Sequence, residues 1–232
     1  MNKGLTPKTE EVFLSIAKSD FIKEFVLVGG SALSLQLHAR YSEDLDFMKW
    51  KKFKNEQPEI PWKSIETELS ALGLGQVKTN LLGFDQVIFF VSDVKLSFYF
   101  RNSFPPEGLV PVPFTGNISI ADIASIGVMK IEVMLRRSVF RDYYDLFSIL
   151  KNGYDIHSLI QKAANYSGHS LKTKNIISML SNGKHFAEEA DFSRLNPEYD
   201  VSCKEIEEFI NSAFLFPPLP PSTTPPPTLP PS

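Results

Sequence analysis

Two aspartates separated by a single residue give the sequence its clearest chemical signal. Asp44 and Asp46 lie in a stretch of alternating acidic and apolar residues typical of a strand. Both side chains then leave the same face, with Cα atoms roughly 6 to 7 Å apart. Two carboxylates this close repel each other unless a cation lies between them, and Mg²⁺ prefers such oxygen ligands together with substrate phosphates. We therefore expect Asp44 and Asp46 to bind Mg²⁺ or Mn²⁺.

A glycine turn precedes the acidic pair. Gly29 and Gly30 end the apolar run 25–28 and let the backbone approach a ligand, while the free N–H groups that open the next helix favour a phosphate. Ser31 can cap that helix and donate its hydroxyl to a phosphate oxygen. Many strand-to-helix turns carry Gly-Gly-Ser for geometric reasons alone. The turn therefore indicates a phosphate site only in combination with the carboxylates that follow it.

The combination is a phosphate-binding turn, a helix, and two carboxylates that return beside the turn on an adjacent strand. Such a site suits phosphoryl transfer. Metal ions bound by the carboxylates would bridge a triphosphate, activate an attacking hydroxyl and stabilise the departing pyrophosphate, while the turn holds the phosphates in line.

Two separated motifs resemble those of one protein family. The first comprises Val28-Gly29-Gly30-Ser31-Ala32-Leu33, then His38, Arg40, Ser42 and Asp44-Leu45-Asp46-Phe47. The second comprises Lys130, Arg137, Arg141, Asp142, Tyr144, Asp145 and Leu146. In this order they are similar to the motifs of the AbiEii/AbiGii toxin family, nucleotidyltransferases of the DNA polymerase beta superfamily. The resemblance covers about residues 21–150.

The resemblance implies an activity and its residues. The reaction would transfer a nucleoside monophosphate from a nucleoside triphosphate to an acceptor hydroxyl, most often of RNA such as transfer RNA, and release pyrophosphate. The chain would be the toxin of a type IV toxin–antitoxin or abortive-infection system, with a cognate antitoxin protein as a partner. The catalytic residues would be Asp44, Asp46, Lys130 and Asp142, and the substrate-binding residues would be Gly29, Gly30, Ser31, Arg40, Arg137 and Arg141.

The basic residues leave alternatives open. Lys130, Arg137 and Arg141 fall nearly on one helical face if the helix continues through Val139, and that stripe could receive an anion. Otherwise they are exposed charges, or Arg141 begins a new helix with Asp142 stabilising its N-terminus.

Arg40 and a lysine-rich segment are also open to two interpretations. Arg40 could neutralise phosphates or form an ion pair with Glu43 or a site aspartate. The segment 49–54 holds four lysines interleaved with two aromatic residues, which suits phosphates and a stacked base, but such stretches are more often solvated connectors.

One departure from the family pattern bears on activity. Many related enzymes carry a third carboxylate on a later strand, where this chain offers Ser97. Asp85 and Asp93 lie in predicted turns and replace it poorly. A nucleotide- or RNA-binding module without turnover is therefore one alternative, and transfer onto a protein hydroxyl is another.

The elements that must position these residues follow from periodicity and caps. We expect an α/β (α+β) fold with a mixed sheet in an N-terminal nucleotidyltransferase core, residues 1–118, and a helical region, residues 119–216, that completes the cleft. The expected helices cover about 7–21, 31–37, 65–72, 120–137, 141–150 and 156–186, with a last one after the capping box at Ser202 and Glu205. The expected strands cover about 25–28, 44–47, 77–82, 86–91 and 94–100.

Composition narrows the class of protein. The 232 residues are 43% hydrophobic with a net charge of −3, so no general basic field attracts nucleic acid. The polar N-terminal stretch lacks a secretory signal, and no apolar run is long enough to span a bilayer. Cys203 is the single cysteine and has no disulfide partner. We therefore expect a cytoplasmic protein without membrane contact. Residues 217–232 are rich in proline and read as a flexible tail.

Overall fold

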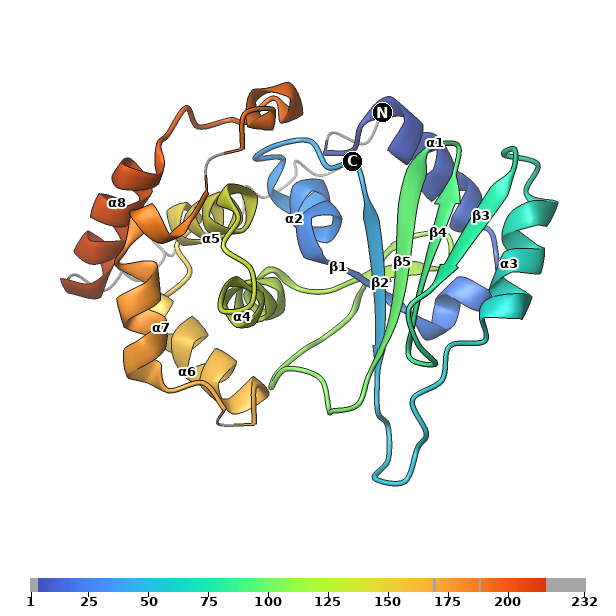
Figure 1. Cartoon of the computed structure of the whole chain (residues 1–232), viewed down its shortest axis with the longest axis horizontal. Coiled ribbons are helices and arrows are strands. Elements are labelled where there is room, and N and C mark those ends of the chain that lie inside the picture. The colour runs from blue at the N-terminus through green and yellow to red at the C-terminus, as the bar shows by residue number, and fades with distance from the viewer. Residues whose placement is uncertain (1–3, 169, 188, 216–232) are drawn as a thin grey trace, which may run out of the picture.

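The computed structural model describes residues 4–168, 170–187 and 189–215, and a mixed sheet of seven strands runs through the part it describes (Figure 1). The strand order is β3-β4-β5-β2-β1-β7-β6. The strands are β1 (Val26–Val28), β2 (Leu45–Trp50), β3 (Val77–Leu81), β4 (Gln86–Val91), β5 (Val94–Arg101), β6 (Val112–Thr115) and β7 (Ile118–Ile120).

The register of the sheet places Asp46 near its centre. Strand β2 runs antiparallel to β1 and parallel to β5, so Asp46 lies opposite Val28 on one side and Ser97 on the other. Strand β1 is also parallel to β7, and the pairs β3–β4, β4–β5 and β6–β7 are antiparallel. Because β2 is an inner strand, its side chains are held by neighbours on both sides.

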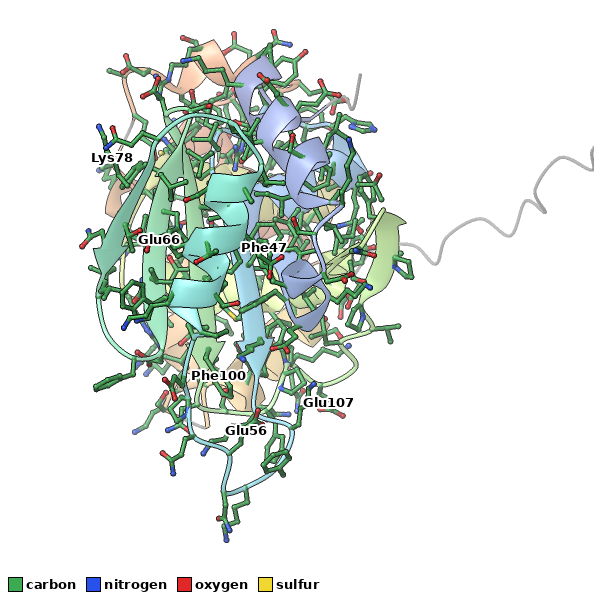
Figure 2. The ribbon with its side chains drawn as sticks, turned by 90° about the vertical axis from the view of Figure 1, so that its right-hand side faces the viewer. Phe47, Glu56, Glu66, Lys78, Phe100 and Glu107 are labelled. Carbon is green, nitrogen blue, oxygen red and sulfur yellow. The ribbon has the colours of Figure 1, made fainter. Side chains whose placement is uncertain are left out.

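One face of the sheet is apolar. It is covered by the helices α1 (Pro7–Ile16) and α3 (Trp62–Ala71) and by the short 3₁₀ helix η1 (Phe21–Glu24). Phe47 and Phe98 stack on this face with ring centroids 5.2 Å apart, and both are fully buried. Figure 2 looks onto this face and shows α3 and α1 lying over it, with Phe47 between them. Since side chains alternate along a strand, burying Phe47 here turns Asp46 to the opposite face.

The opposite face is covered by helices that lie together on the other side of the sheet (Figure 1). Helices α2, α4 and α5 pack on one another next to β1 and β2, and α6, α7 and α8 form an outer layer. Their bounds are α2 (Gly29–Leu37), α4 (Ile123–Met134), α5 (Phe140–Lys151), α6 (Ile156–Tyr166), α7 (Thr173–Leu180) and α8 (Cys203–Leu215), with short turns η2 (Gly183–His185) and η3 (Phe192–Leu195).

Local signals correctly predict many of these elements, and the expected α/β fold with a mixed sheet is confirmed. Helix α1 begins directly after Thr6 as its N-cap. Ser92 and Asp93 both have positive φ (51° and 64°) and form the tight turn between β4 and β5. Ser202 and Glu205 exchange hydrogen bonds ahead of α8, as a capping box requires.

Other expectations are wrong. The pattern does not reveal β6 and β7, which are short and continue the sheet beyond β1. The helix through Val139 does not exist, because α4 ends at Met134 and Val139 is the extended N-cap of α5. Asp142 therefore lies in the first turn of a new helix, which was the alternative interpretation.

Some predictions stay predictions. The division into a core at 1–118 and a helical region at 119–216 is untested, although the described strands end at Ile120 and the described residues after it form helices. The tail at 217–232 lies outside the described residues. Within the part of the chain that is described, no helix combines the length and the apolar character needed to cross a bilayer.

Candidate functional site

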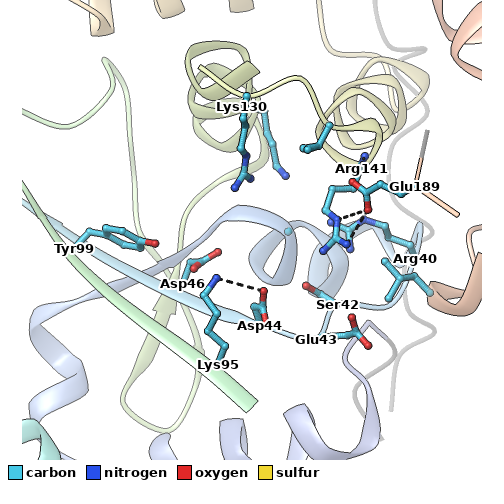
Figure 3. A pocket seen from close by; sticks show the side chains of 14 residues that line it. Arg40, Ser42, Glu43, Asp44, Asp46, Lys95, Tyr99, Lys130, Arg141 and Glu189 are labelled. Atoms are coloured by element: carbon cyan, nitrogen blue, oxygen red, sulfur yellow. Dashed lines mark hydrogen bonds and ion pairs between the residues drawn. The ribbon is translucent and has the colours of Figure 1, made fainter. Parts of the chain in front are cut away.

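The two aspartates project into one hollow. Asp44 directly precedes β2 and Asp46 is its second residue, and both line a cavity of about 280 Å³ between the sheet and the helices. Figure 3 shows their carboxylates side by side, with Lys130 above them. The strand that carries them continues into the apolar core through Leu45 and Phe47, which fixes the direction of the pair.

The surroundings of Asp46 disfavour its negative charge. Burial raises the pKa of Asp46 above its ordinary value, and the nearby charge of Asp44 adds to the shift, while Lys95 and Lys130 oppose it. Gly29 lies so close that a Cβ there would stand 3.2 Å from Asp46 Oδ2. The positive φ of Gly29 (67°) also disfavours any side chain. Glycine is therefore required where the chain passes Asp46.

Ser31 and Gly30 have structural contacts that the sequence did not indicate. Ser31 is buried and does not cap α2, whose N-cap is Val28, so the capping prediction is wrong. Its hydroxyl hydrogen-bonds the Asp44 carbonyl oxygen and, at 2.9 Å, Ser42 Oγ, which ties the turn to the start of β2. Gly30 lines the hollow, and its Cα faces Arg40, because a Cβ there would lie 2.5 Å from Arg40 Nη2.

Lys130 enters the hollow from α4 and is buried at its base. Its ammonium lies 2.7 Å from Asp142 Oδ1 and 2.5 Å from Asp145 Oδ2. Burial alone would lower the pKa of Lys130, but the charges of Asp142 and Asp145 outweigh it and raise the pKa. Lys130 therefore remains a cation. Asp142 is fully buried beneath it, lines neither this hollow nor the second one described below, and holds Lys130 from behind.

Arg40 pairs with a residue 105 positions away. Its guanidinium forms two parallel hydrogen bonds to Asp145, at 2.7 and 2.8 Å, and donates a third to the Tyr41 carbonyl oxygen at 2.8 Å. An ion pair with Glu43 or a site aspartate was one of the two alternatives for Arg40. The structure gives Arg40 the partner Asp145 instead, and Glu43 pairs with Arg194. Burial opposes the charge of Asp145, but Arg40 and Lys130 overcome it and lower the pKa of Asp145 to about 2.

The other two expected arginines line the rim of the hollow. Arg137 follows the end of α4 and hydrogen-bonds Asp142 at 2.8 and 3.2 Å, with more than half of its side chain exposed. Arg141 pairs with Glu189 at 2.8 Å (Figure 3). Both face the same hollow as Asp44 although they lie on separate elements.

The structure adds residues that the sequence analysis missed. Lys95 and Tyr99, on β5, line the hollow, and Lys95 Nζ lies 3.7 Å from Asp44 Oδ2. Their two-residue spacing from Ser97 is the signal that could have indicated them, because residues at this spacing share a face. Glu189 had no such signal, since its contact with Arg141 joins distant parts of the chain.

A second hollow adjoins the first. It measures about 340 Å³, and Gly30, Asp46, Tyr99, Lys130 and Arg137 line both cavities. The walls of the second hollow include apolar side chains. They are Val28, Met48, Ile126, Met129 and Val133. The charged residues Arg101, Glu132 and Arg136 also line this hollow.

A partly buried network holds two of these charged residues, Arg101 and Glu132. Arg101 donates to both carboxylate oxygens of Glu132 at 3.2 Å, and its guanidinium stacks over the Tyr166 ring at 4.3 Å. Tyr166 in turn accepts a hydrogen bond from Trp50 Nε1 at 2.9 Å. The two hollows thus differ in character. The first is lined mainly by charged side chains and the second partly by apolar ones, and they meet at Asp46.

Known proteins show similarity over most of the chain. The family model of the nucleotidyl transferase AbiEii toxins of type IV toxin–antitoxin systems matches residues 12–222. An uncharacterized protein of Aquifex aeolicus, aq_aa25, is 26% identical over 214 residues, which cover 89% of this chain and 94% of the relative.

Two solved structures share the fold. JHP933 from Helicobacter pylori has 20% sequence identity and a TM-score of 0.55, with 91% of this chain and 93% of that chain covered. MenT4, a nucleotidyltransferase toxin from Mycobacterium tuberculosis, has 14% identity and a TM-score of 0.52, with 90% and 84% covered. The family match spans both motifs and the helices behind them. The chain therefore belongs to the AbiEii nucleotidyl transferase toxin family.

Proposed function

We propose that this protein transfers a nucleoside monophosphate from a nucleoside triphosphate to a hydroxyl group of RNA, with transfer RNA as the first candidate acceptor. The observation that carries the proposal is the convergence of Asp46, Lys130 and Arg137 where two hollows meet, with Asp44 beside them in the first hollow. Family membership implies a nucleotide substrate and an antitoxin counterpart. A cytoplasmic location would follow from an RNA acceptor.

The two hollows suggest where each substrate binds. A nucleoside needs apolar walls and a few polar groups, as the hollow beside α4 provides with Met48, Met129 and the Arg101–Glu132 pair. The charged hollow, lined by Lys95 and Arg141, suits the phosphates of an acceptor strand. With the two substrates placed in this way, the α-phosphate of the nucleotide would lie beside Asp46, where the hollows meet.

The residues divide the chemical work. Lys130 remains protonated and would stabilise charge on the triphosphate, and Arg137 would do so from the rim. Asp145 and Asp142 would position Lys130 and Arg40 rather than contact the substrate. Gly29 would let the phosphates approach the backbone at the start of α2.

The donor set fits a divalent cation. Asp44 and Asp46 face one hollow, repel each other and lie partly open to solvent, which suits hard oxygen-preferring ions such as Mg²⁺ or Mn²⁺. Asp44 and Asp46 would hold such an ion, which would supply positive charge to neutralise the negative charge that develops during transfer.

The acceptor is identified by labelling. Purified protein is incubated with each α-labelled nucleoside triphosphate, Mg²⁺ and total bacterial RNA, with the Asp46→Ala variant as a control. We expect label on RNA with the wild type and none with the variant. The labelled RNA is then sequenced to identify the acceptor and the added nucleotide.

Other results would redirect the proposal. Label on polypeptide would indicate transfer to a protein hydroxyl. Binding of nucleotide and RNA without any transfer would indicate a binding module, which Ser97 opposite Asp46 makes the main competing function.

A further inference from the structure

Lys95, on the strand next to β2, lies beside the acidic pair. Strand β5 carries Lys95, Ser97 and Tyr99 on the face that Asp46 occupies, and Ser97 is in direct register with Asp46. Lys95 Nζ lies 3.7 Å from Asp44 Oδ2, and 35% of the Lys95 side chain and 41% of the Asp44 side chain are exposed. Figure 3 shows Lys95 rising from β5 toward the two aspartates. The strand next to the acidic pair thus brings a cation instead of another carboxylate.

The number of carboxylates limits how many metal ions the site can hold. Two divalent ions about 3.5 to 4 Å apart need several anionic ligands to offset their repulsion. Among residues 4–168, 170–187 and 189–215, no group of three or more His, Cys, Asp or Glu side chains is placed to hold a metal ion. Asp44 and Asp46 provide two negative charges, and Lys95 neutralises one of them. The protein therefore offers enough charge for one divalent ion and too little for two.

The charged groups on the helical side of the hollow do not supply the missing negative charge. Lys130, Arg137 and Arg40 are matched against Asp142 and Asp145, which leaves one excess positive charge on that side of the hollow. Glu43 and Glu189 also line the hollow, but their charges are paired with those of Arg194 and Arg141. A second divalent ion would add to positive charge from both sides.

We propose that Lys95 replaces a second metal ion: Asp44 and Asp46 hold one divalent ion together with the nucleotide phosphates, and the Lys95 ammonium supplies the other positive charge beside the acceptor hydroxyl. This inference rests on the nucleotidyl transfer proposed above. Lys95 lines the charged hollow, assigned there to the acceptor, and does not line the hollow assigned to the nucleoside. It is therefore a catalytic residue on the acceptor side.

The step can be written in full. The acceptor oxygen forms a bond to the α-phosphorus, and the bond from that phosphorus to the bridging oxygen of the pyrophosphate breaks with its electron pair on the pyrophosphate. The hydroxyl proton passes to water, which reaches the open hollow. The Lys95 ammonium stabilises the negative charge that develops on the attacking oxygen as the proton leaves.

The first test counts ions. Free Mn²⁺ is measured by electron paramagnetic resonance in the presence of the protein and the α,β-methylene analogue of the nucleoside triphosphate that the labelling assay selects, with analogue alone as the blank. We expect one Mn²⁺ per wild-type chain and two per chain of the double variant Lys95→Gln, Ser97→Asp, which restores a third carboxylate. Two Mn²⁺ ions bound to the wild type would overturn the proposal.

The second test separates catalysis from ion pairing. Lys95→Gln should lower kcat for transfer about 100-fold with little change in the KM for nucleotide, and Lys95→Arg should recover most of the loss. Lys8→Gln is the matched control. Lys8 lines neither hollow and forms an exposed ion pair with Asp93, with 3.1 Å between Lys8 Nζ and Asp93 Oδ2, so its replacement should leave kcat unchanged. A Lys95→Gln enzyme with wild-type kcat would show that the contact with Asp44 is only a surface ion pair.

The two proposals can fail separately. If the wild type transfers label and binds two Mn²⁺ ions, nucleotidyl transfer stands and the role of Lys95 is wrong. If the wild type neither transfers label nor binds any nucleoside triphosphate analogue, the proposed function fails and the role of Lys95 falls with it.

Discussion

At the scale of single residues, the charges beneath the hollow are the most tightly constrained feature. Arg40, Lys130 and Asp145 are all buried, and Asp145 contacts both of the cations directly. A buried charge that loses its partner is costly, because the desolvation penalty remains when the attraction is gone. This cluster therefore links the stability of the fold to the position of Lys130 in the site.

The Asp145→Asn variant tests this link. We expect it to lower the free energy of unfolding by about 3 to 5 kcal/mol at pH 7, because Arg40 and Lys130 lose the charge they share. Asp93→Asn, which removes an exposed ion pair with Lys8, should change it by less than about 1 kcal/mol. Urea denaturation of both variants measures the difference.

The contribution of Asp145 should depend on pH in a definite direction. Its pKa falls from an ordinary 3.8 to about 2 in the folded protein, so its stabilising charge is fully present above pH 4 and is lost as the pH falls toward 2. The difference between wild type and Asp145→Asn should therefore shrink between pH 4 and pH 2. A difference that stays constant over this range would contradict the assigned pairing.

Residues differ in how far the sequence could place them. Asp44 and Asp46 were predictable because a two-residue period fixes a shared face without any knowledge of the fold. The pairing of Arg40 with Asp145 was not, since it joins positions 105 residues apart and nothing local distinguishes it from pairing with Glu43. Lys95 was missed for the same reason, because its contact with Asp44 depends on which strand lies next to β2.

At the scale of elements, the connection from β1 to α2 has the least freedom. Gly29 has a left-handed φ beside Asp46, and Gly30 meets the guanidinium of Arg40. The turn is fastened to β2 by Ser31, which hydrogen-bonds the Asp44 carbonyl oxygen. Direct contacts therefore join the turn, the acidic pair and the buried ion cluster into one unit.

Gly30→Ala should disturb this unit through steric contact alone. The added Cβ would lie 2.5 Å from Arg40 Nη2, and Arg40 cannot give way without breaking its two bonds to Asp145. We expect a loss of about 1 to 3 kcal/mol in the free energy of unfolding. Ser64→Ala, at an exposed position in the first turn of α3, should change it by less than about 0.5 kcal/mol. Thermal unfolding at equal concentrations compares the two, and equal effects would contradict the close contact at Gly30.

Among elements, those with caps or strong periodicity were predictable. Pro7 after Thr6, and the capping box before α8, mark helix starts by local chemistry. The break between α4 and α5 was ambiguous, because Lys130, Arg137 and Arg141 keep a helical spacing although α4 ends at Met134 and α5 begins at Phe140. Strands β6 and β7 are only a few residues long and are stabilised by sheet pairing that no local pattern records.

At the scale of the whole molecule, the sheet and the helices form the two sides of the site. The sheet side presents Asp44, Asp46 and Lys95, and the helical side presents Lys130 and Arg141 (Figure 3). Arg137, in the connection between α4 and α5, also lies on the helical side. The hollows therefore exist only in the assembled fold, and the sequence alone could not divide the cleft into a charged and a partly apolar part.

This division predicts separate effects on the two substrates. Val133→Trp should fill the partly apolar hollow beside α4, raise the KM for the nucleotide at least tenfold and leave the affinity for RNA unchanged. Val110→Trp, at a position that is 65% exposed and lines neither hollow, is the control. Steady-state kinetics and RNA binding by filter retention measure both. Weaker RNA binding with an unchanged nucleotide KM would reverse the assignment of the hollows.

The central claim is that Asp44 and Asp46 form the centre of nucleotidyl transfer, and one rate measurement tests it most directly. Under single-turnover conditions with saturating Mg²⁺, transfer of labelled nucleotide to RNA is compared between wild type, Asp46→Asn and Asp93→Asn. We predict that Asp46→Asn lowers the rate roughly a thousandfold, several kcal/mol of transition-state stabilisation, while Asp93→Asn retains the wild-type rate. An Asp46→Asn protein that folds and transfers nucleotide within tenfold of the wild-type rate would contradict the account.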